Sequence, residues 1–166
     1  FHLRDDLTWS NGEKITAESY RKSWLDSLKN SPMIEEKYRM FVVKNAEKFS
    51  ENKVSEKEVG IQVKDNVLEV TLNTPIPNFD EWVSNPIFYP LHPKNETLKE
   101  EDKIVNAAFK IASFQENKII LEKNEDYWDA VNTRLKKVDI SLVEDGIMAY
   151  EMFPRYEIDI FGAPFY

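Results

Sequence analysis

The chain has 166 residues, of which 42% are hydrophobic and 31% charged, enough apolar material for one domain with a core or for two small lobes. Its net charge of −8 leaves no basic stripe to neutralise phosphates, which argues against nucleic-acid binding. The absence of cysteine excludes disulfides, thiolate catalysis and zinc–thiolate sites, and with only four glycines there is no Gly-rich loop to cradle a phosphate.

The sequence also indicates whether the chain is part of a longer protein. No apolar run approaches the roughly 20 residues that span a bilayer, and no signal peptide is present. The chain starts at Phe1 rather than at Met, inside a stretch that reads as a strand. We therefore expect it to be an excerpt or processed piece of a longer protein.

The first elements predicted are a strand, a tight turn and a capped helix. Residues 1–4 read as the strand, and Asn11-Gly12 supplies the turn because both residues tolerate positive φ. Thr16 is placed so that its hydroxyl can cap the helix of residues 17–29. The helix carries apolar residues on one face at helical spacing: Ala17, Tyr20, Trp24, Leu25 and Leu28.

The next part of the chain changes from helical to strand periodicity. Residues 33–49 are mostly helical in pattern, with an interruption near Val42-Val43, and residues 45–52 fit a separate short helix. Apolar residues then alternate with polar ones in 61–63 and again in 68–72. This alternation predicts a β-hairpin around a tight turn.

A second β-rich section follows a proline-rich connection. Residues 78–83 predict a short helix, and residues 85–93, which hold three prolines, predict an extended loop. The polar, acidic residues 95–102 are the best candidate for a boundary between lobes. Residues 109–114 and 118–122 flank a turn and predict another hairpin.

The end of the chain predicts a strand, a helix and a last strand, over residues 138–142, 145–153 and 157–160. The helix is expected to direct three apolar side chains partly inward: Ile147, Met148 and Tyr150.

Chemistry-bearing residues are scattered in the sequence. His2 and His92 are too isolated to suggest a metal site, and no cofactor is expected. The carboxylates of residues 100–102 and 125–126 are adjacent, which is typical of a solvated surface rather than of an acid/base pair held across a cleft. The four tryptophans are dispersed between elements, so we expect most of them to pack in cores or between lobes: Trp9, Trp24, Trp82 and Trp128.

Several segments occur in a characteristic order and spacing. They are the opening string LRDDLTWSNGEKITAE of residues 3–18, Lys44-Asn45-Ala46-Glu47, the first hairpin, IILEKNEDYWD of residues 119–129 and Glu157-Ile158-Asp159-Ile160. Together they resemble the corresponding segments of extracellular solute-binding proteins of family 5, the peptide receptors of ABC importers.

The resemblance implies a mixed α/β (α+β) fold with lobes like those of type II periplasmic binding proteins, as an excerpt of a larger receptor. Residues 1–97 correspond to the small lobe and residues 98–166 to part of the first lobe, with the large third domain and the N-terminal lipoprotein cysteine outside the sequence. Such receptors capture extended oligopeptides through backbone hydrogen bonds between closing lobes and are not enzymes. Their partners are permease subunits, and they are periplasmic or extracellular and membrane-anchored.

The resemblance also places candidate ligand-binding residues at two points. Phe161, Gly162 and Ala163 follow the last predicted strand near the binding groove, although they also fit a plain strand exit. Met33 and Tyr38 lie where family members often have a tyrosine-rich helix start near the ligand, although ordinary helix packing fits them as well.

Three alternatives remain open from the sequence. In the first, the chain is a structural or interaction lobe that binds no ligand alone, and a large exposed apolar patch would favour this reading. In the second, the chain is part of a family relative that binds dipeptides, nickel chelates or sugars. In the third, it is a carboxylate hydrolase, which requires two converging carboxylates with perturbed pKa values.

Overall fold

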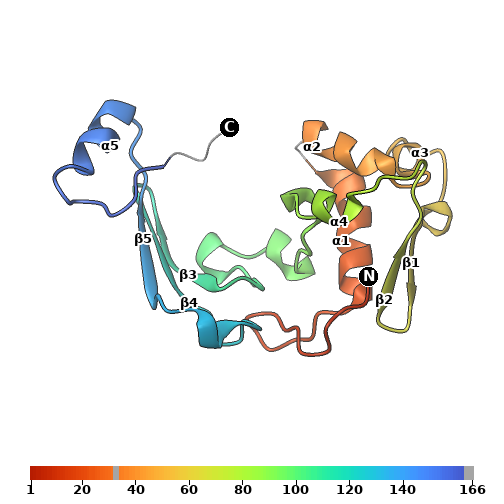
Figure 1. Cartoon of the computed structure of the whole chain (residues 1–166), viewed down its shortest axis with the longest axis horizontal. Coiled ribbons are helices and arrows are strands. Elements are labelled where there is room, and N and C mark those ends of the chain that lie inside the picture. Colours follow the sequence, from red (N-terminus) through yellow and green to blue (C-terminus); the bar gives the residue numbers. More distant parts are fainter. Residues whose placement is uncertain (32–33, 163–166) are drawn as a thin grey trace.

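The computed structural model describes residues 1–31 and 34–162, which form two arms joined at their base (Figure 1). The helical arm, residues 17–88, contains most of the helices and a two-stranded sheet. The sheet arm, residues 109–162, contains a three-stranded sheet and one α-helix. Residues 1–16 and 89–108 run along the base between them. None of the helices in the described ranges is long and apolar enough to cross a membrane.

The helix α1, Ala17–Asn30, confirms the first predicted helix and the turn before it. In that turn Gly12 has a φ of +82° and donates its N–H to the carbonyl of Trp9 at 2.8 Å. Thr16 is the N-cap of α1, and its backbone N–H donates to Ser19 Oγ at 3.2 Å. The predicted apolar face is the buried one, since Trp24, Leu25 and Leu28 all lie in the core.

Three short helical segments follow α1, and the break after residue 42 lies where the sequence predicted it, whereas the change from α-helix to 3₁₀ helix after residue 38 was not predicted. They are α2 (Ile34–Tyr38), the 3₁₀ helix η1 (Arg39–Val42) and α3 (Ala46–Ser50). Val43 is extended and forms a bridge to Leu72, and Asn45 has a φ of +60°. A residue in extended or left-handed conformation cannot continue a right-handed helix, so the pattern divides here.

The first predicted hairpin is confirmed as β1 (Ile61–Lys64) paired antiparallel with β2 (Val67–Val70). Asp65 in its two-residue turn has a φ of +54°. The predicted short helix is present as α4, Phe79–Trp82. The predicted strand at residues 1–4 is wrong, because only one bridge forms, between His2 and β2.

The prediction of an extended loop over 85–93 is wrong at both ends, because two of its three prolines begin 3₁₀ helices, η3 (Pro86–Phe88) and η4 (Pro93–Glu96), and only Asn85 and residues 89–92 lie outside a helix. Proline suits the first position of a helix, where its missing N–H needs no partner. The side chain of Asn85 accepts from the backbone of Ile87 and caps η3. The described residues contain three other 3₁₀ helices: η2 (Glu56–Glu58), η5 (Glu100–Asp102) and η6 (Ala130–Asn132).

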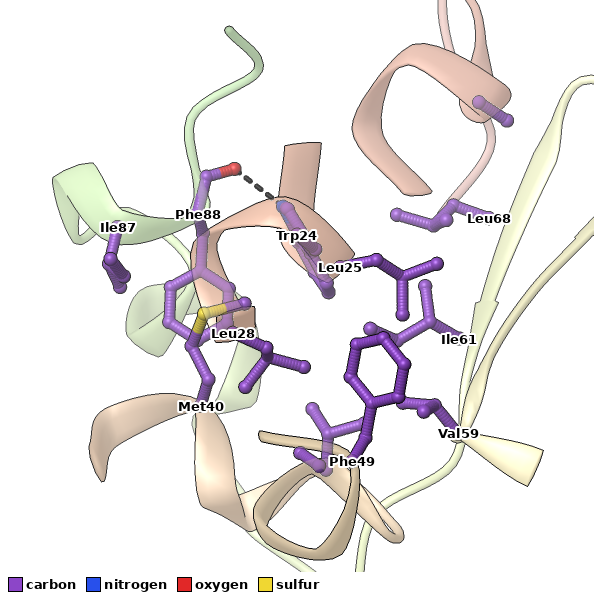
Figure 2. Close-up of a cluster of buried hydrophobic side chains, with 13 residues drawn as sticks. Trp24, Leu25, Leu28, Met40, Phe49, Val59, Ile61, Leu68, Ile87 and Phe88 are labelled. Atoms are coloured by element: carbon purple, nitrogen blue, oxygen red, sulfur yellow. Dashed lines mark hydrogen bonds between the residues drawn. The ribbon is translucent and has the colours of Figure 1, made fainter. Parts of the chain in front are cut away.

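The hydrophobic core lies within the helical arm, between α1, α3, the hairpin and η3 (Figure 2). Trp24 Nε1 donates to the carbonyl of Phe88 at 2.6 Å, so the one polar atom of the indole is satisfied inside the core. In the described residues, no hydrophobic side chain after Pro90 is buried. The side chains labelled in Figure 2 are Trp24, Leu25, Leu28, Met40, Phe49, Val59, Ile61, Leu68, Ile87 and Phe88.

The sheet arm confirms the second predicted hairpin and the strand after it. Its antiparallel sheet has the order β3 (Phe109–Gln115), β4 (Lys118–Lys123) and β5 (Lys137–Ser141). The register of β3 against β4 shifts between Ile111 and Ser113, which marks a β-bulge.

The C-terminal part of the sheet arm corrects two predictions. The helix is present as α5, Gly146–Met152, but the expectation that its apolar side chains point partly inward is wrong. Ile147, Met148 and Tyr150 are 74%, 61% and 63% exposed, because the described residues do not cover them. The strand predicted at 157–160 is also wrong, since a strand requires a hydrogen-bonded neighbour and no described strand pairs with these residues.

Candidate functional site

The predicted ligand-binding residues do not form one cluster. Tyr38 ends α2 with 59% of its surface exposed, and its ring meets Phe41 edge-on at 5.3 Å. Phe161 follows α5, is 44% exposed and contacts Tyr150 at 5.8 Å. A side chain at Gly162 would meet nothing within 4 Å. Because α2 and α5 lie on different arms (Figure 1), Tyr38 and Phe161 are not in contact.

Two other predicted binding residues, Met33 and Ala163, lie outside the described residues. The described candidates therefore present one exposed aromatic ring on each arm, with open space at Gly162. Exposed aromatic side chains are suited to contact a ligand or a partner, since they offer a large rigid surface at a low entropic cost.

Two polar hollows open on the helical arm, and none of the predicted binding residues lines either of them. The larger has a volume of about 390 Å³ and lies beside η2, and Lys44, Gly60 and Thr71 are among the residues that line it. The smaller, of about 240 Å³, lies beside α4 and is lined by Trp82 and Arg39 among others. The larger hollow exists because three backbone segments meet closely: Gly60 N–H donates to the Lys44 carbonyl and Thr71 N–H to the Gly60 carbonyl, both at 2.8 Å.

The base of the molecule holds a hydrogen-bonded cluster that joins residues far apart in sequence. His92 is only 2% exposed, and its ring meets Trp9 edge-on at 5.2 Å. His92 Nε2 lies 3.0 Å from Glu13 Oε2, and Lys94 Nζ lies 3.0 Å from Glu13 Oε1. The cluster thus fastens the turn before α1 to the 3₁₀ helix η4.

The geometry of this cluster defines the direction of its hydrogen bonds. The backbone N–H of Lys94 donates to His92 Nδ1 at 3.3 Å, so Nδ1 is an acceptor. In a neutral imidazole the proton is then on Nε2, which donates to the Glu13 carboxylate. Together with Lys94, this hydrogen bond from His92 lowers the pKa of Glu13 from 4.5 to about 2.

The segment before α1 also contacts Val105, which precedes the sheet arm, and two residues within the sheet arm, Asp126 and Trp128. Ser10 N–H donates to the Val105 carbonyl at 2.7 Å, and Thr8 Oγ1 donates to the Asp126 carbonyl at 3.1 Å. The Arg4 guanidinium lies 4.4 Å from the centre of the Trp128 ring, a cation–π contact. Residues 4–10 therefore link the two arms.

Asn124 is the buried polar residue at this junction. It is 1% exposed, its Nδ2 donates to the Ala107 carbonyl at 2.9 Å, and its Oδ1 accepts from the Asp126 N–H at 3.2 Å. Its own N–H donates to the Ala108 carbonyl at 2.9 Å. One side chain thus fixes the loop after β4 against the segment that leads into β3.

The perturbed carboxylates of the described residues are held as anions rather than poised to carry protons. Besides Glu13, the pKa of Asp6 is lowered by its hydrogen bond from Arg4, that of Glu58 by backbone and hydroxyl donors of Ser55, and that of Asp139 by Lys137 and Lys118. A general acid needs the opposite shift. Over residues 1–31 and 34–162, no three histidine or carboxylate side chains are grouped to hold a metal ion.

Sequence reasoning missed His92 and Asn124 as residues that position other segments. His92 was isolated in the sequence because its carboxylate partner lies 79 residues earlier. Asn124 was one polar residue in a polar turn, and nothing local distinguishes it from its exposed neighbours. A His-Pro pair at a 3₁₀ start was the only available local signal, and it predicts a cap but no distant partner.

The fold and this junction define a lobe of the type II periplasmic-binding-protein class, with mixed helices and strands, as predicted. Residues 1–166 match the family model described as bacterial extracellular solute-binding proteins, family 5 Middle, so the chain belongs to this family. The oligopeptide-binding protein OppA of Bacillus subtilis (strain 168) is 31% identical over 176 residues, which cover 99% of this chain and 32% of that protein.

Two solved structures show the same similarity in three dimensions. A periplasmic oligopeptide-binding protein (OppAIV) from Borrelia burgdorferi aligns with a TM-score of 0.83 and 34% identity over 96% of this chain and 34% of that chain. Listeria monocytogenes OppA bound to peptide aligns with a TM-score of 0.83 and 28% identity over 95% of this chain and 33% of that chain. The chain spans about a third of the length of these relatives.

Proposed function

We propose that this chain is part of the peptide-binding subunit of an ABC importer, a subunit that captures extended oligopeptides between two closing lobes. The observation that carries the proposal is the match along nearly the whole chain to proteins named oligopeptide-binding, one of them solved with a peptide bound. An extended peptide offers a backbone N–H and C=O at every residue, so a receptor that binds the backbone accepts many sequences.

In this proposal residues 1–97 belong to the small lobe and residues 98–166 to the first lobe. Tyr38 contacts the ligand from one lobe and Phe161 and Gly162 from the other, and Met33 and Ala163 are proposed as further ligand contacts. The exposure of Tyr38 and Phe161 on different arms supports these roles, because lobe closure requires contacts from both sides. The links of residues 4–10 to the sheet arm are then the contacts about which the lobes move.

The rest of the proposal concerns the parent protein. It works without a cofactor and without catalysis, at the outer side of the cytoplasmic membrane. An N-terminal lipid anchor holds it there, and it delivers peptide to the permease subunits of the importer. The shifted pKa values of the carboxylates are all lowered, so none of these groups has the raised pKa that a hydrolytic general acid needs.

Calorimetric titration tests the proposal, using the 166-residue chain and the full-length protein that carries this sequence. The titrant is a pool of mixed-sequence tri- to pentapeptides. Binding by the full-length protein alone supports the receptor and makes this chain a structural lobe that needs the rest. If neither protein binds the pool, the proposal is overturned, and dipeptides, nickel chelates and sugars are the next ligands to titrate.

A variant pair tests the ligand contact at Tyr38. In the full-length protein Tyr38→Ala is expected to weaken peptide binding roughly tenfold, about 1.4 kcal/mol. The control is Tyr89→Ala, since Tyr89 is also a half-exposed tyrosine but lies outside the proposed contacts. Equal affinities of the two variants would remove Tyr38 from the site while leaving the receptor proposal intact.

A further inference from the structure

Asn11 is the one asparagine of the sequence that is followed by glycine. Asn11 and Gly12 are both exposed, in the turn before α1. A Cβ at Gly12 would meet nothing within 4 Å, so no neighbouring segment crowds this glycine. The side-chain amide of Asn11 is therefore open to attack by the backbone nitrogen of Gly12, because glycine has no side chain that hinders the approach.

Two hydrogen bonds of this turn involve the groups that would react. The backbone N–H of Glu13 donates to Asn11 Oδ1 at 3.0 Å, and that of Gly12 donates to the Trp9 carbonyl at 2.8 Å. The first bond favours the reaction, because negative charge develops on Oδ1 when a nucleophile attacks Cγ, and a donor already points at that oxygen. The second bond restrains the nucleophile, but a single hydrogen bond in an exposed turn slows the attack by no more than about tenfold.

We propose that Asn11 is a site of spontaneous deamidation in the folded chain, with water as the only co-reactant, and that the isoaspartate product loosens the turn. The Gly12 nitrogen loses its proton to solvent and bonds to Asn11 Cγ, the Cγ–Nδ2 bond breaks, and Nδ2 takes up a proton and leaves as ammonia. Water then opens the resulting succinimide ring at one of its two carbonyl carbons. Opening at the backbone carbonyl gives isoaspartate, in which the chain continues through Cγ, and opening at Cγ gives aspartate.

The position of the turn gives the isoaspartate product a structural consequence. Trp9 N–H donates to the Glu13 carbonyl at 2.8 Å, and the Glu13 carboxylate reaches His92 and Lys94 of the base. Isoaspartate inserts an additional methylene into the backbone of this turn, so its hydrogen bonds cannot all keep their geometry. The product therefore weakens the contact between the turn and η4. Aspartate leaves the contact in place, because its carboxylate accepts the same bond from the Glu13 N–H.

Asp145-Gly146 is the other pair in which glycine follows a side chain that is able to form such a ring. Its carboxyl group is the N-cap of α5, and Asp145 Oδ1 accepts from the N–H groups of Ile147 and Met148 at 2.8 and 3.0 Å. These donors stabilise the ionised carboxylate, which resists attack by a nucleophile. Asn11, whose side chain is an uncharged amide, is therefore the reactive member of the two pairs.

Incubation of the 166-residue chain in mildly alkaline buffer, followed by proteolysis and mass spectrometry, tests the site. Asn117 is the internal reference, since it is also exposed and lies in a turn but is followed by Lys118. Conversion of the amide to the acid is expected at least about tenfold faster at Asn11, because only Gly12 lacks a side chain. Equal rates at the two asparagines would overturn the proposal. Conversion of Asn11 in urea but not in the folded chain would also overturn it, because the turn would then protect the amide.

Two variants test the consequence of the product. Asn11→Asp carries the charge of the product without the additional methylene, and it should unfold at the same denaturant concentration as the fresh chain. The incubated chain should unfold at a lower concentration, in proportion to its isoaspartate content. Asn11→Gln, whose longer side chain closes the ring less readily, should show no such loss on incubation. Equal midpoints for the incubated chain and Asn11→Asp would overturn the loosening of the turn.

The backbone amide of Lys94 gives a local measurement of the same consequence. Its N–H donates to His92 Nδ1 at 3.3 Å, so it should exchange with solvent faster in the incubated chain than in Asn11→Asp. Equal exchange rates would show that the turn keeps its contact with η4, and would overturn the loosening. None of these measurements uses peptide, so their outcome is independent of the receptor proposal.

Discussion

Leu28 in the helical arm is fully buried, whereas Leu142, the residue after β5 in the sheet arm, is 44% exposed. Both arms contain regular elements, and both α1 and α5 begin after a cap residue, but only α1 packs its apolar face into the hydrophobic core of the described chain. Local sequence therefore suffices to form the elements of both arms, while burial depends on what lies across from each element.

The largest expected effect comes from truncating one leucine in each arm. Leu28→Ala should lower the free energy of unfolding by about 2–5 kcal/mol, because it leaves a cavity in the core. Leu142→Ala in the same chain should cost less than about 1 kcal/mol, since half of the side chain is already in water. Urea unfolding followed by circular dichroism measures both. Similar losses would contradict the contrast between the arms.

Two glycine substitutions extend the comparison to the backbone. A Cβ at Gly60 would lie 2.5 Å from the Thr71 carbonyl and 2.9 Å from Lys44 Cβ, so Gly60→Ala should destabilise the chain by about 1–3 kcal/mol. A Cβ at Gly146, the first residue of α5, would meet nothing within 4 Å. Gly146→Ala should therefore be neutral or stabilising by up to about 1 kcal/mol. Thermal unfolding measures the stability of both variants. A lower stability of Gly146→Ala would show that other residues already pack against the start of α5.

Asn124 tests the junction between the arms. Asn124→Ala removes a buried side chain with two hydrogen bonds and leaves the Ala107 carbonyl without its donor, at a cost of about 1–3 kcal/mol. The exposed Asn132, which bonds only to Asp129 through its side chain, is the matched control, and Asn132→Ala should change stability by less than about 0.5 kcal/mol. The denaturant midpoints of the two variants measure these changes. An equal loss of stability in both would show that Asn124 does not stabilise the junction between the arms.

The smallest expected effect is a pH dependence at the base. Because the pKa of Glu13 falls from 4.5 to about 2 on folding, this carboxylate stabilises the folded chain fully above pH of about 4.5. Its contribution is lost as the pH falls from there towards 2. Glu13→Gln should flatten the dependence of stability on pH in that window and leave the slope near neutral pH unchanged. An unaltered slope between pH 4.5 and 2 would show that His92 and Lys94 do not hold the carboxylate.

Local signals in the sequence predicted the elements of both arms well. The cap at Thr16, the glycine turn before it and the alternation around Asp65 each act within a few residues, and each is present. The prolines at 86 and 93 misled the prediction, because proline permits a 3₁₀ start as readily as an extended loop.

Contacts between residues far apart in the sequence could not be predicted from such local signals. The pairing of His92 with Glu13 depends on the complete fold, and the exposure of α5 depends on which residues pack across from it. The family resemblance found the class of protein and supplied the candidate contacts Tyr38, Phe161 and Gly162. Those contacts stay predictions, because their role requires a ligand and the opposite lobe.

Amide hydrogen exchange of the 166-residue chain, followed residue by residue by NMR, tests the contrast between the arms most directly. The slowest-exchanging amides are expected in α1 and the β1–β2 hairpin, around Leu28, Ile61 and Leu68, where exchange requires opening of the core. Those of β4, although hydrogen-bonded on both sides, should exchange at least tenfold faster. Equal protection of β4 and α1 would contradict the contrast and show that the sheet arm is as stable on its own as the helical arm.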